Sequence, residues 1–259
     1  MFFILKYSFL FLAELFYMLN FYKLSLYFYK TVYENNHNVL ECLEHMISCY
    51  GYLGEYDSVI KYSDRYLELN KNNLNVYIYK AQALLVFEKD ADALIYYDSV
   101  LNVDSENIFA LVGKTHVLLK LEKDDLFLEY CERVLSIDSN NYHVLYFLSQ
   151  FYFRLNQFDL ALKYVDSSLD VEENNFPALF FKAKILIKMG AYDESLPILN
   201  KLLVVDPENI DVLFLKALVL RDMGENYKAN ECINSILELD ENYDDVLDLG
   251  KSLEEFNNF

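Results

Sequence analysis

Residues 176–209 read FPALFFKAKILIKMGAYDESLPILNKLLVVDPEN, and residues 210–243 follow the same pattern as IDVLFLKALVLRDMGENYKANECINSILELDENY. Both segments are 34 residues long, and large apolar, small and turn-forming residues recur at matching places. A fixed period of this length is typical of stacked supersecondary units and not of a single globular core. These two segments therefore decide the class of the fold.

The same 34-residue register extends back through most of the chain without insertion or deletion. It defines seven repeats: 6–39, 40–73, 74–107, 108–141, 142–175, 176–209 and 210–243. The last segment, 244–259, carries Val246, Leu249, Leu253 and Phe256, and we expect it to form an amphipathic helix that caps the last repeat. The sequence thus predicts one elongated domain over residues 1–259.

Each repeat contains two apolar-periodic stretches separated by a short turn. Positions 4 and 11 of the repeat are large and apolar, and their spacing of seven keeps them on one helix face. Positions 8 and 20 are mostly small, which lets two antiparallel helices approach closely. Position 15 is glycine or asparagine in five repeats, and both residues tolerate the left-handed conformation that ends a helix. We expect helix A at about positions 2–14 and helix B at about positions 18–31.

Position 34 is asparagine in five consecutive repeats. The residues are Asn73, Asn107, Asn141, Asn175 and Asn209. An asparagine directly before a helix can accept a hydrogen bond from the unpaired backbone N–H groups of the first turn. We therefore predict that these residues are N-caps of the helices that follow.

The whole arrangement resembles the tetratricopeptide repeat family. The likeness rests on the residues at positions 4, 8, 11 and 20 and on the acid-proline ending at Asp206-Pro207, and it covers roughly residues 6–243. It implies an all-α fold, a right-handed α-solenoid (superhelix) of seven helix-turn-helix repeats. It also implies a non-catalytic scaffold or adaptor that binds a peptide or protein. Ile47, Val59 and Phe127 occupy positions that are small in the family, which predicts local repacking.

In this family helix A lines the concave side, where ligands usually lie, so the resemblance implies that positions 2, 5, 9, 12 and 13 face a groove. In repeats 4–7 these positions combine aromatic side chains with a row of cations, which suits an extended peptide with apolar and acidic groups. The candidate partner-binding residues are Phe109, His116, Lys120, His143, Tyr146, Gln150, Phe153, Arg154, Phe180, Lys184, Lys188 and Phe214. A second interpretation of the cations is that they complement the dipole at the end of helix A.

Two further columns of the register are read as structural. Position 23 is tyrosine in four repeats, which indicates packing of helix B, with a second binding face as the alternative. Position 7 is lysine in four repeats, and we expect the side-chain stems to pack while the ammonium groups reach water. The tyrosines are Tyr62, Tyr96, Tyr130 and Tyr164, and the lysines are Lys80, Lys114, Lys182 and Lys216.

The net charge of −19 and the pI of about 4.5 disfavour nucleic-acid binding, which needs a basic surface. Cys42, His45 and Cys49 lie at i, i+3 and i+7, as metal ligands can, but other repeats carry mostly apolar residues at these positions. We therefore expect core packing and no metal. The four cysteines form no disulfide framework in a chain this long, and reduced thiols fit a cytoplasmic protein.

Catalytic motifs are absent from the sequence. It has no Gly-rich phosphate loop, no His-Glu-x-x-His and no Gly-x-Ser-x-Gly. A solenoid of this repeat also offers no closed pocket that excludes water, which catalysis usually needs. We predict neither enzyme activity nor a cofactor, and the Lys/Asn set that binds chaperone tails in some family members is missing.

The N-terminal segment 1–29 is rich in Phe, Leu and Tyr. Lys6, Glu14 and Lys23 interrupt it, so no uncharged stretch approaches the ~18 residues that a membrane span needs. The segment also keeps the repeat register, which favours a first repeat over a span or a signal peptide. Because a terminal repeat should be polar on its outer face, we expect residues 1–39 to contact a partner, a second copy or a membrane surface. Membrane association through this end is the alternative to a purely cytoplasmic location.

Overall fold

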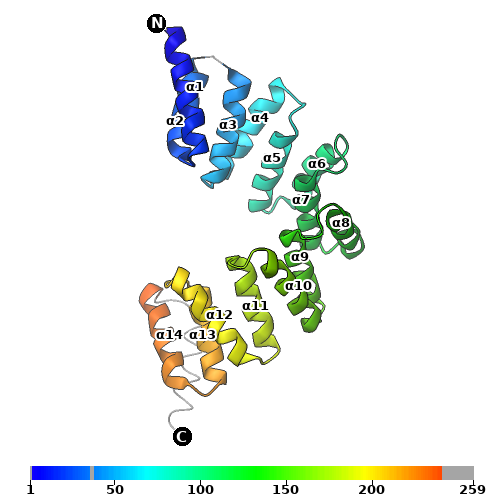
Figure 1. Ribbon diagram of the computed structural model, residues 1–259, viewed down its shortest axis with the longest axis vertical. Coiled ribbons are helices and arrows are strands. Elements are labelled where there is room, and N and C mark those ends of the chain that lie inside the picture. Colours follow the sequence, from blue (N-terminus) through cyan, green and yellow to red (C-terminus); the bar gives the residue numbers. More distant parts are fainter. Residues whose placement is uncertain (1, 36–37, 241–259) are drawn as a thin grey trace. The chain divides into compact units, whose positions relative to one another are not determined.

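The computed structural model describes residues 2–35 and 38–240, with side chains described from residue 7 onward. In these ranges the chain forms 14 α-helices joined by short turns, and they contain no strand (Figure 1). The helices are α1 Phe2–Met18, α2 Tyr22–Glu34, α3 Val39–Tyr52, α4 Tyr56–Leu69, α5 Leu74–Val86, α6 Asp90–Leu101, α7 Ile108–Lys120, α8 Asp124–Ile137, α9 Tyr142–Arg154, α10 Phe158–Val171, α11 Phe176–Lys188, α12 Tyr192–Val205, α13 Ile210–Asp222 and α14 Asn226–Leu239.

Successive helices form the seven predicted helix-turn-helix repeats, with odd-numbered helices as helix A and even-numbered helices as helix B. In most repeats both helices begin one position earlier than expected, at positions 1 and 17, as α7 and α8 do. The all-α repeat fold is thereby confirmed. The end of the seventh repeat and the predicted capping helix at 244–259 lie outside the described residues.

Contacts divide the chain into two compact units, Met1–Ile137 and Asp138–Phe259. Helices α1–α8 belong to the first unit and α9–α14 to the second. Within each unit each helix packs on the next one along the chain. That the repeats form one continuous domain stays a prediction.

The asparagines at position 34 are N-caps, as predicted. The Asn73 side chain accepts a hydrogen bond from the backbone N–H of Asn75 at 3.0 Å. Each of the other four accepts from the backbone N–H three residues ahead, as Asn175 does from Ala178 at 3.0 Å. One residue type thus begins five A helices by satisfying an otherwise unpaired donor.

The small residues at positions 8 and 20 lie where helices A and B of one repeat meet. Ala13 and Ser25 of the first repeat are fully buried, and the Ser25 hydroxyl donates to the Ala13 carbonyl oxygen at 2.9 Å. This contact fixes α1 against α2 and confirms that the N-terminal segment folds as a first repeat. The larger Ile47, Val59 and Phe127 are also buried at these positions, so repacking accommodates them.

Within each unit, helix A packs on helix B of the preceding repeat, with positions 3, 6 and 10 at the contact. His45 of α3 stacks on Tyr29 of α2, with ring centroids 4.8 Å apart. At Gly113 of α7 an added Cβ would lie 2.3 Å from the ring of Tyr97 in α6, so a large residue at position 24 meets a small one at position 6. Positions 3 and 10 are buried throughout repeats 2–7. The residues are Cys42, Val76, Ala110, Val144, Ala178 and Val212, and Cys49, Ala83, Val117, Phe151, Ile185 and Val219.

The lysines at position 7 differ from the expectation that their ammonium groups reach water. Lys80 of α5 is buried, and its ammonium binds Asp64 of α4 and donates to the Tyr96 hydroxyl at 2.5 Å. Lys114 repeats this arrangement with Asp98 at 2.5 Å and Tyr130 at 2.9 Å. Lys182 binds Asp166 at 2.7 Å. These lysines join one repeat to the one before it because position 25 of that repeat supplies an aspartate.

Candidate functional site

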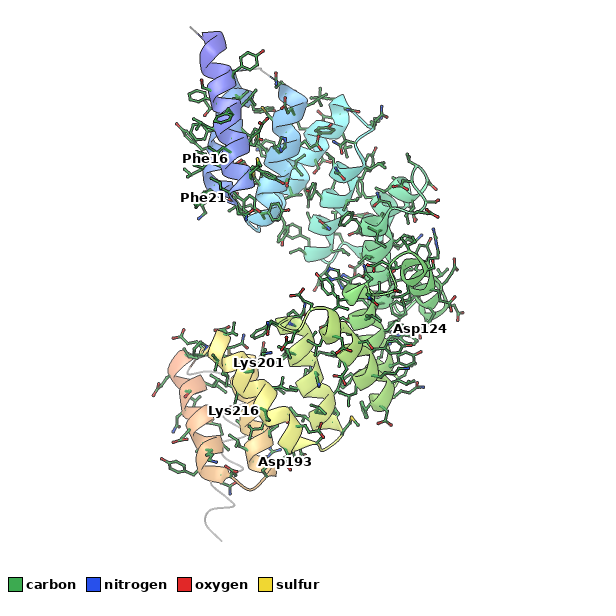
Figure 2. The ribbon with its side chains drawn as sticks, in the orientation of Figure 1. Phe16, Phe21, Asp124, Asp193, Lys201 and Lys216 are labelled. Atoms are coloured by element: carbon green, nitrogen blue, oxygen red, sulfur yellow. The ribbon has the colours of Figure 1, made fainter. Side chains whose placement is uncertain are left out.

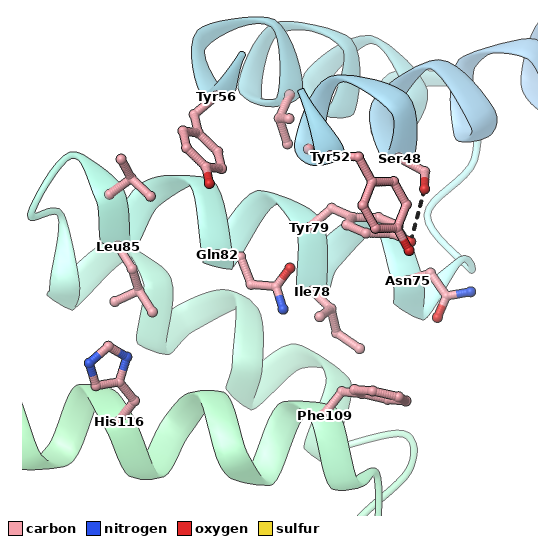
Figure 3. A pocket seen from close by; sticks show the side chains of 13 residues that line it. Ser48, Tyr52, Tyr56, Asn75, Ile78, Tyr79, Gln82, Leu85, Phe109 and His116 are labelled. Atoms are coloured by element: carbon pink, nitrogen blue, oxygen red, sulfur yellow. Dashed lines mark hydrogen bonds between the residues drawn. The ribbon is translucent and has the colours of Figure 1, made fainter. Parts of the chain in front are cut away.

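A hollow of about 660 Å³ opens on the A helices of repeats 2–4, inside the first unit (Figure 3). Helices α3, α5 and α7 supply most of its walls, and α4 supplies the remainder. The lining residues are Ser48, Gly51, Tyr52, Tyr56, Val59, Asn75, Ile78, Tyr79, Gln82, Leu85, Val86, Phe109 and His116.

Most of these residues occupy the register positions that the resemblance assigns to the groove. Asn75 and Phe109 stand at position 2, Gln82 and His116 at position 9, and Tyr52 at position 13. In Figure 3 Gln82 reaches from α5 toward α7, which carries both Phe109 and His116. The hollow is therefore built by equivalent faces of three consecutive A helices.

The chemistry of the hollow is apolar and uncharged. Tyr52 and Phe109 present large rings that are 60% and 68% exposed, with Ile78 and Leu85 beside them. Among the described residues that line it, none is Asp, Glu, Lys or Arg. An uncharged surface with exposed aromatic rings and a few amides favours the apolar side chains of a polypeptide over a charged ligand.

Stacked and hydrogen-bonded tyrosines hold one wall of the hollow in place. The ring of Tyr52 stacks on Tyr22 of α2 at 4.3 Å between centroids. Ser48 shares a hydrogen bond with the Tyr17 hydroxyl at 2.7 Å and accepts one from Tyr79 at 3.3 Å. Burial raises the pKa of Tyr17 to about 12, against a smaller opposing effect of the Ser48 hydrogen bond, so this hydroxyl is neutral at physiological pH. The wall is thus tied to the first repeat.

Of the twelve predicted partner-binding residues, three lie in the first unit. Phe109 and His116 line the hollow, and their role in binding stays a prediction. Lys120 instead binds Asp90 of α6 at 2.8 Å. The first member of the predicted cation row therefore already has an acidic partner within the chain.

The aromatic candidates of the second unit are half-buried. Tyr146 and Phe153 of α9 contact the ring of Phe181 in α11, at centroid distances of 5.7 and 5.1 Å. Phe180 and Phe214 pack beside the cores of their own repeats. Burial raises the pKa of Tyr146, partly offset by a hydrogen bond to Gln150. These rings have structural contacts, and their role in binding stays a prediction.

The polar and charged candidates of the second unit lie closer to solvent. His143 is exposed beside Tyr142, and Lys188 is also exposed. The Lys184 ammonium lies 5.8 Å from the centroid of Phe180, and the Arg154 guanidinium lies 5.5 Å from that of Phe151. Each of these two cations lies over an aromatic ring of its own helix, and its role in binding stays a prediction.

The sequence-based prediction passed over the residues of repeats 2 and 3 that line the hollow. Tyr52, Asn75, Gln82 and Val86 occupy the same register positions as the predicted residues of repeats 4–7. The sequence favours repeats 4–7 as the binding region because cations accompany aromatic residues at the groove positions there. The register alone contained the missing signal, since it marks the same positions in every repeat.

The suspected metal ligands take part in packing. Cys42 and Cys49 are fully buried in the core of the first unit, and the ring of His45 lies against Tyr29. Burial raises the pKa of the Cys49 thiol to about 11, which keeps it protonated and a poor metal ligand. Over residues 2–35 and 38–240 no group of three or more His, Cys, Asp or Glu side chains is placed to hold a metal ion.

The apolar N-terminal segment also raised the alternative of a membrane-spanning helix. None of the described helices combines the length and apolar character required to cross a bilayer.

Comparisons with known proteins agree with this architecture. The family model described as anaphase-promoting complex, cyclosome, subunit 3 matches residues 128–202, which is well under half of the chain. A search of curated proteins gave no sequence match.

Among solved structures, a tetratricopeptide repeat protein from Parabacteroides merdae is similar with a TM-score of 0.72 at 11% identity, over 96% of this chain and 98% of that one. YrrB, described as a TPR protein with an unusual peptide-binding site, has a TM-score of 0.55 at 24% identity, over 73% of this chain and 97% of its own. Yeast Tom70 has a TM-score of 0.64 at 17% identity, over 90% of this chain and 58% of its own. At these identities the similarity defines the fold. Together with the seven-fold register, it shows that this chain has the helical-repeat fold of tetratricopeptide repeat proteins.

Proposed function

We propose that this chain is a non-catalytic protein-interaction scaffold that binds a segment of a partner polypeptide in the hollow on α3, α5 and α7. The observation that carries the proposal is the hollow of about 660 Å³, formed by the groove positions of three consecutive A helices. A volume in this range accommodates one or two large side chains of a bound segment.

The uncharged lining favours a partner segment with apolar side chains over an acidic one. An acidic peptide would find no cation among the described lining residues, and the nearby Lys120 is already paired with Asp90. A segment with a Trp, Phe or Leu anchor can place its side chain against Tyr52 and Phe109. Asn75 and Gln82 carry amides that can exchange hydrogen bonds with an extended peptide backbone.

The absence of tryptophan from the chain gives a direct assay. Random peptides selected on the immobilised full chain would be resynthesised with a single Trp, whose fluorescence then reports on the peptide alone. We expect Phe109→Ala and Tyr52→Ala each to weaken binding about 10-fold or more, because central aromatic anchors contribute most of the energy at such sites.

The matched control is Tyr227→Ala, which removes a ring that is 77% exposed on α14, in the second unit. It should leave binding unchanged. Tyr146→Ala, Phe180→Ala and Phe214→Ala belong to the same panel. If those three weaken binding while Phe109→Ala and Tyr52→Ala do not, the site lies in the second unit and the present assignment is wrong.

The first repeat supports a second role as a docking point for a membrane surface or a second copy. The observation that favours it is the set of apolar side chains exposed on α1, on α2 and in the turn between them. They include Tyr7, Phe11, Met18, Phe21, Leu24 and Tyr27.

A further inference from the structure

Among the described residues, no helix covers the face of α1 that carries positions 6 and 10. At position 10 every repeat from the second to the seventh has a buried residue, whereas Leu15 of the first repeat is 38% exposed. At position 6, Phe11 is 63% exposed, whereas Phe181 at the same position is buried. The first repeat therefore presents to solvent an apolar surface of the kind that the rest of the chain buries.

A second set of exposed apolar residues lies on α2 and at the residue directly before it. Phe21, Leu24 and Tyr27 stand at positions 16, 19 and 22 and are each about half exposed or more. Later repeats mostly place polar or charged residues there, such as Lys89 and Glu129. Figure 2 shows Phe21 at the edge of the first repeat, away from α3. These positions are mostly polar in later repeats, so the uncovered face of α1 does not explain why they are apolar in the first repeat.

Charge distinguishes this end from the remainder of the chain. Residues 1–33 contain three lysines and a single acid, Glu14, in a protein whose net charge is −19. Lys23 is exposed between Phe21 and Leu24, so a cation lies within the apolar set. Aromatic rings, aliphatic side chains and lysine together are the composition that partitions into the interface of an anionic bilayer.

We propose that the first repeat docks on the surface of an anionic lipid bilayer through Phe11, Leu15, Phe21, Leu24 and Tyr27, with Lys23 contacting lipid headgroups. This rests on the second role proposed above and names its occupant. Charge favours a lipid surface over a second copy, because a second copy would bring the same excess of lysine to this end, whereas anionic headgroups are complementary to it. Binding is peripheral, because no described helix can cross the bilayer.

The test is co-sedimentation of the full chain with vesicles of phosphatidylcholine alone or with about a third phosphatidylserine. We expect binding to the anionic vesicles that weakens with salt, because the phosphatidylserine charge attracts lysine. The triple variant Phe11→Glu/Leu24→Glu/Tyr27→Glu should lose binding at least 10-fold. Lys23→Gln should weaken binding to anionic vesicles about five-fold and leave any binding to neutral vesicles unchanged.

The matched control variant is Ile95→Glu/Val204→Glu/Tyr227→Glu, which replaces apolar side chains that are 63%, 83% and 77% exposed elsewhere. It should sediment like the wild type, and circular dichroism should show that both triple variants are folded. Equal loss in both variants would overturn the proposal, because it would mean that any exposed apolar residue suffices. Failure of the wild type to sediment would also overturn it, and a dimer in light scattering that Phe11→Glu dissociates would assign the face to a second copy.

The Trp-peptide assay separates this proposal from the scaffold role. The triple variant Phe11→Glu/Leu24→Glu/Tyr27→Glu, which should lose vesicle binding, keeps every residue that lines the hollow. We expect it to bind selected peptides as the wild type does. Loss of vesicle binding with retained peptide binding therefore supports two independent surfaces.

Discussion

At the scale of single residues, the turn between helices A and B makes the strictest demand on the backbone. All seven residues at position 15 have a positive φ, between 53° and 82°. Three are glycine and two are asparagine, which adopt this conformation at little cost. Glu88 and Glu122 adopt it as well, although a Cβ-bearing glutamate is strained there. The geometry of the turn therefore outweighs the preference of the residue.

Replacement of Glu88 by glycine should stabilise the third repeat. The change removes the strain that a residue with a Cβ has in the left-handed conformation. Glycine also has more conformational entropy in the unfolded chain, which offsets part of this gain. We expect the free energy of unfolding to rise by roughly 0.5–1 kcal/mol. Thermal unfolding followed by circular dichroism should show a higher Tm. The reverse change, Gly190→Glu, should lower it, and a lower Tm for Glu88→Gly would contradict this account.

At the scale of helices, positions 7, 11 and 23 vary together. Where position 7 is Lys80 or Lys114, position 11 is leucine and the tyrosine at position 23 binds the lysine. In repeats 2 and 5 position 7 is apolar, and the tyrosine at position 11 stacks on the tyrosine at position 23, with centroids 5.2 Å apart in both repeats. In repeat 1 position 7 is also apolar, and Phe16 stacks on Phe28 at these two positions. The tyrosine at position 23, which we predicted to be structural, thus has a lysine as its partner in some repeats and a tyrosine in others.

The Lys80 contact should make the junction of α4 and α5 sensitive to charge. Burial alone lowers the pKa of Lys80, but hydrogen bonds to Asp64 and Tyr96 more than reverse this effect, and the pKa is raised. A raised pKa in the folded state stabilises the protein fully below the ordinary lysine pKa of about 10.5. This stabilisation is lost as pH rises through the folded value.

Asp64→Asn should therefore lower the free energy of unfolding by about 1 kcal/mol at pH 7, because the Lys80 ammonium loses its charged partner. Urea titration at pH 7 and at about pH 11 should show a smaller difference at the higher pH. In a Lys80→Met/Leu84→Tyr background, which reproduces the pairing of the second repeat, Asp64→Asn should have little effect. An equal effect in both backgrounds would mean that Asp64 acts independently of Lys80.

At the scale of the whole molecule, the net charge of −19 opposes folding through self-repulsion. Salt screens repulsion between exposed charges, with a Debye length of about 10 Å at 0.1 M. We expect the Tm to rise by a few degrees between about 10 mM and 300 mM NaCl, and KCl to act alike. A Tm that falls with salt would show that the ion pairs between repeats outweigh the repulsion.

The candidate site combines information from two levels. The register placed Phe109 and His116 on the groove face, and both line the hollow. It could not indicate that Lys120 reaches Asp90, because the two residues are 30 apart in the chain and meet only when α6 and α7 pack. It also could not indicate that a hollow opens on the A helices of repeats 2–4. The depth of the hollow depends on which side chains fill the space between helices.

The sequence by itself determined the all-α class, the number of repeats, the N-caps, the left-handed turns and the small residues between helices. These follow from local chemistry that recurs every 34 residues, so each copy supports the interpretation of the others. The tertiary structure alone decided which lysines are buried against aspartates and which aromatic residues stay exposed. Those outcomes depend on the neighbour that each helix meets, and in the first repeat no described helix covers Phe11 and Leu15 of α1.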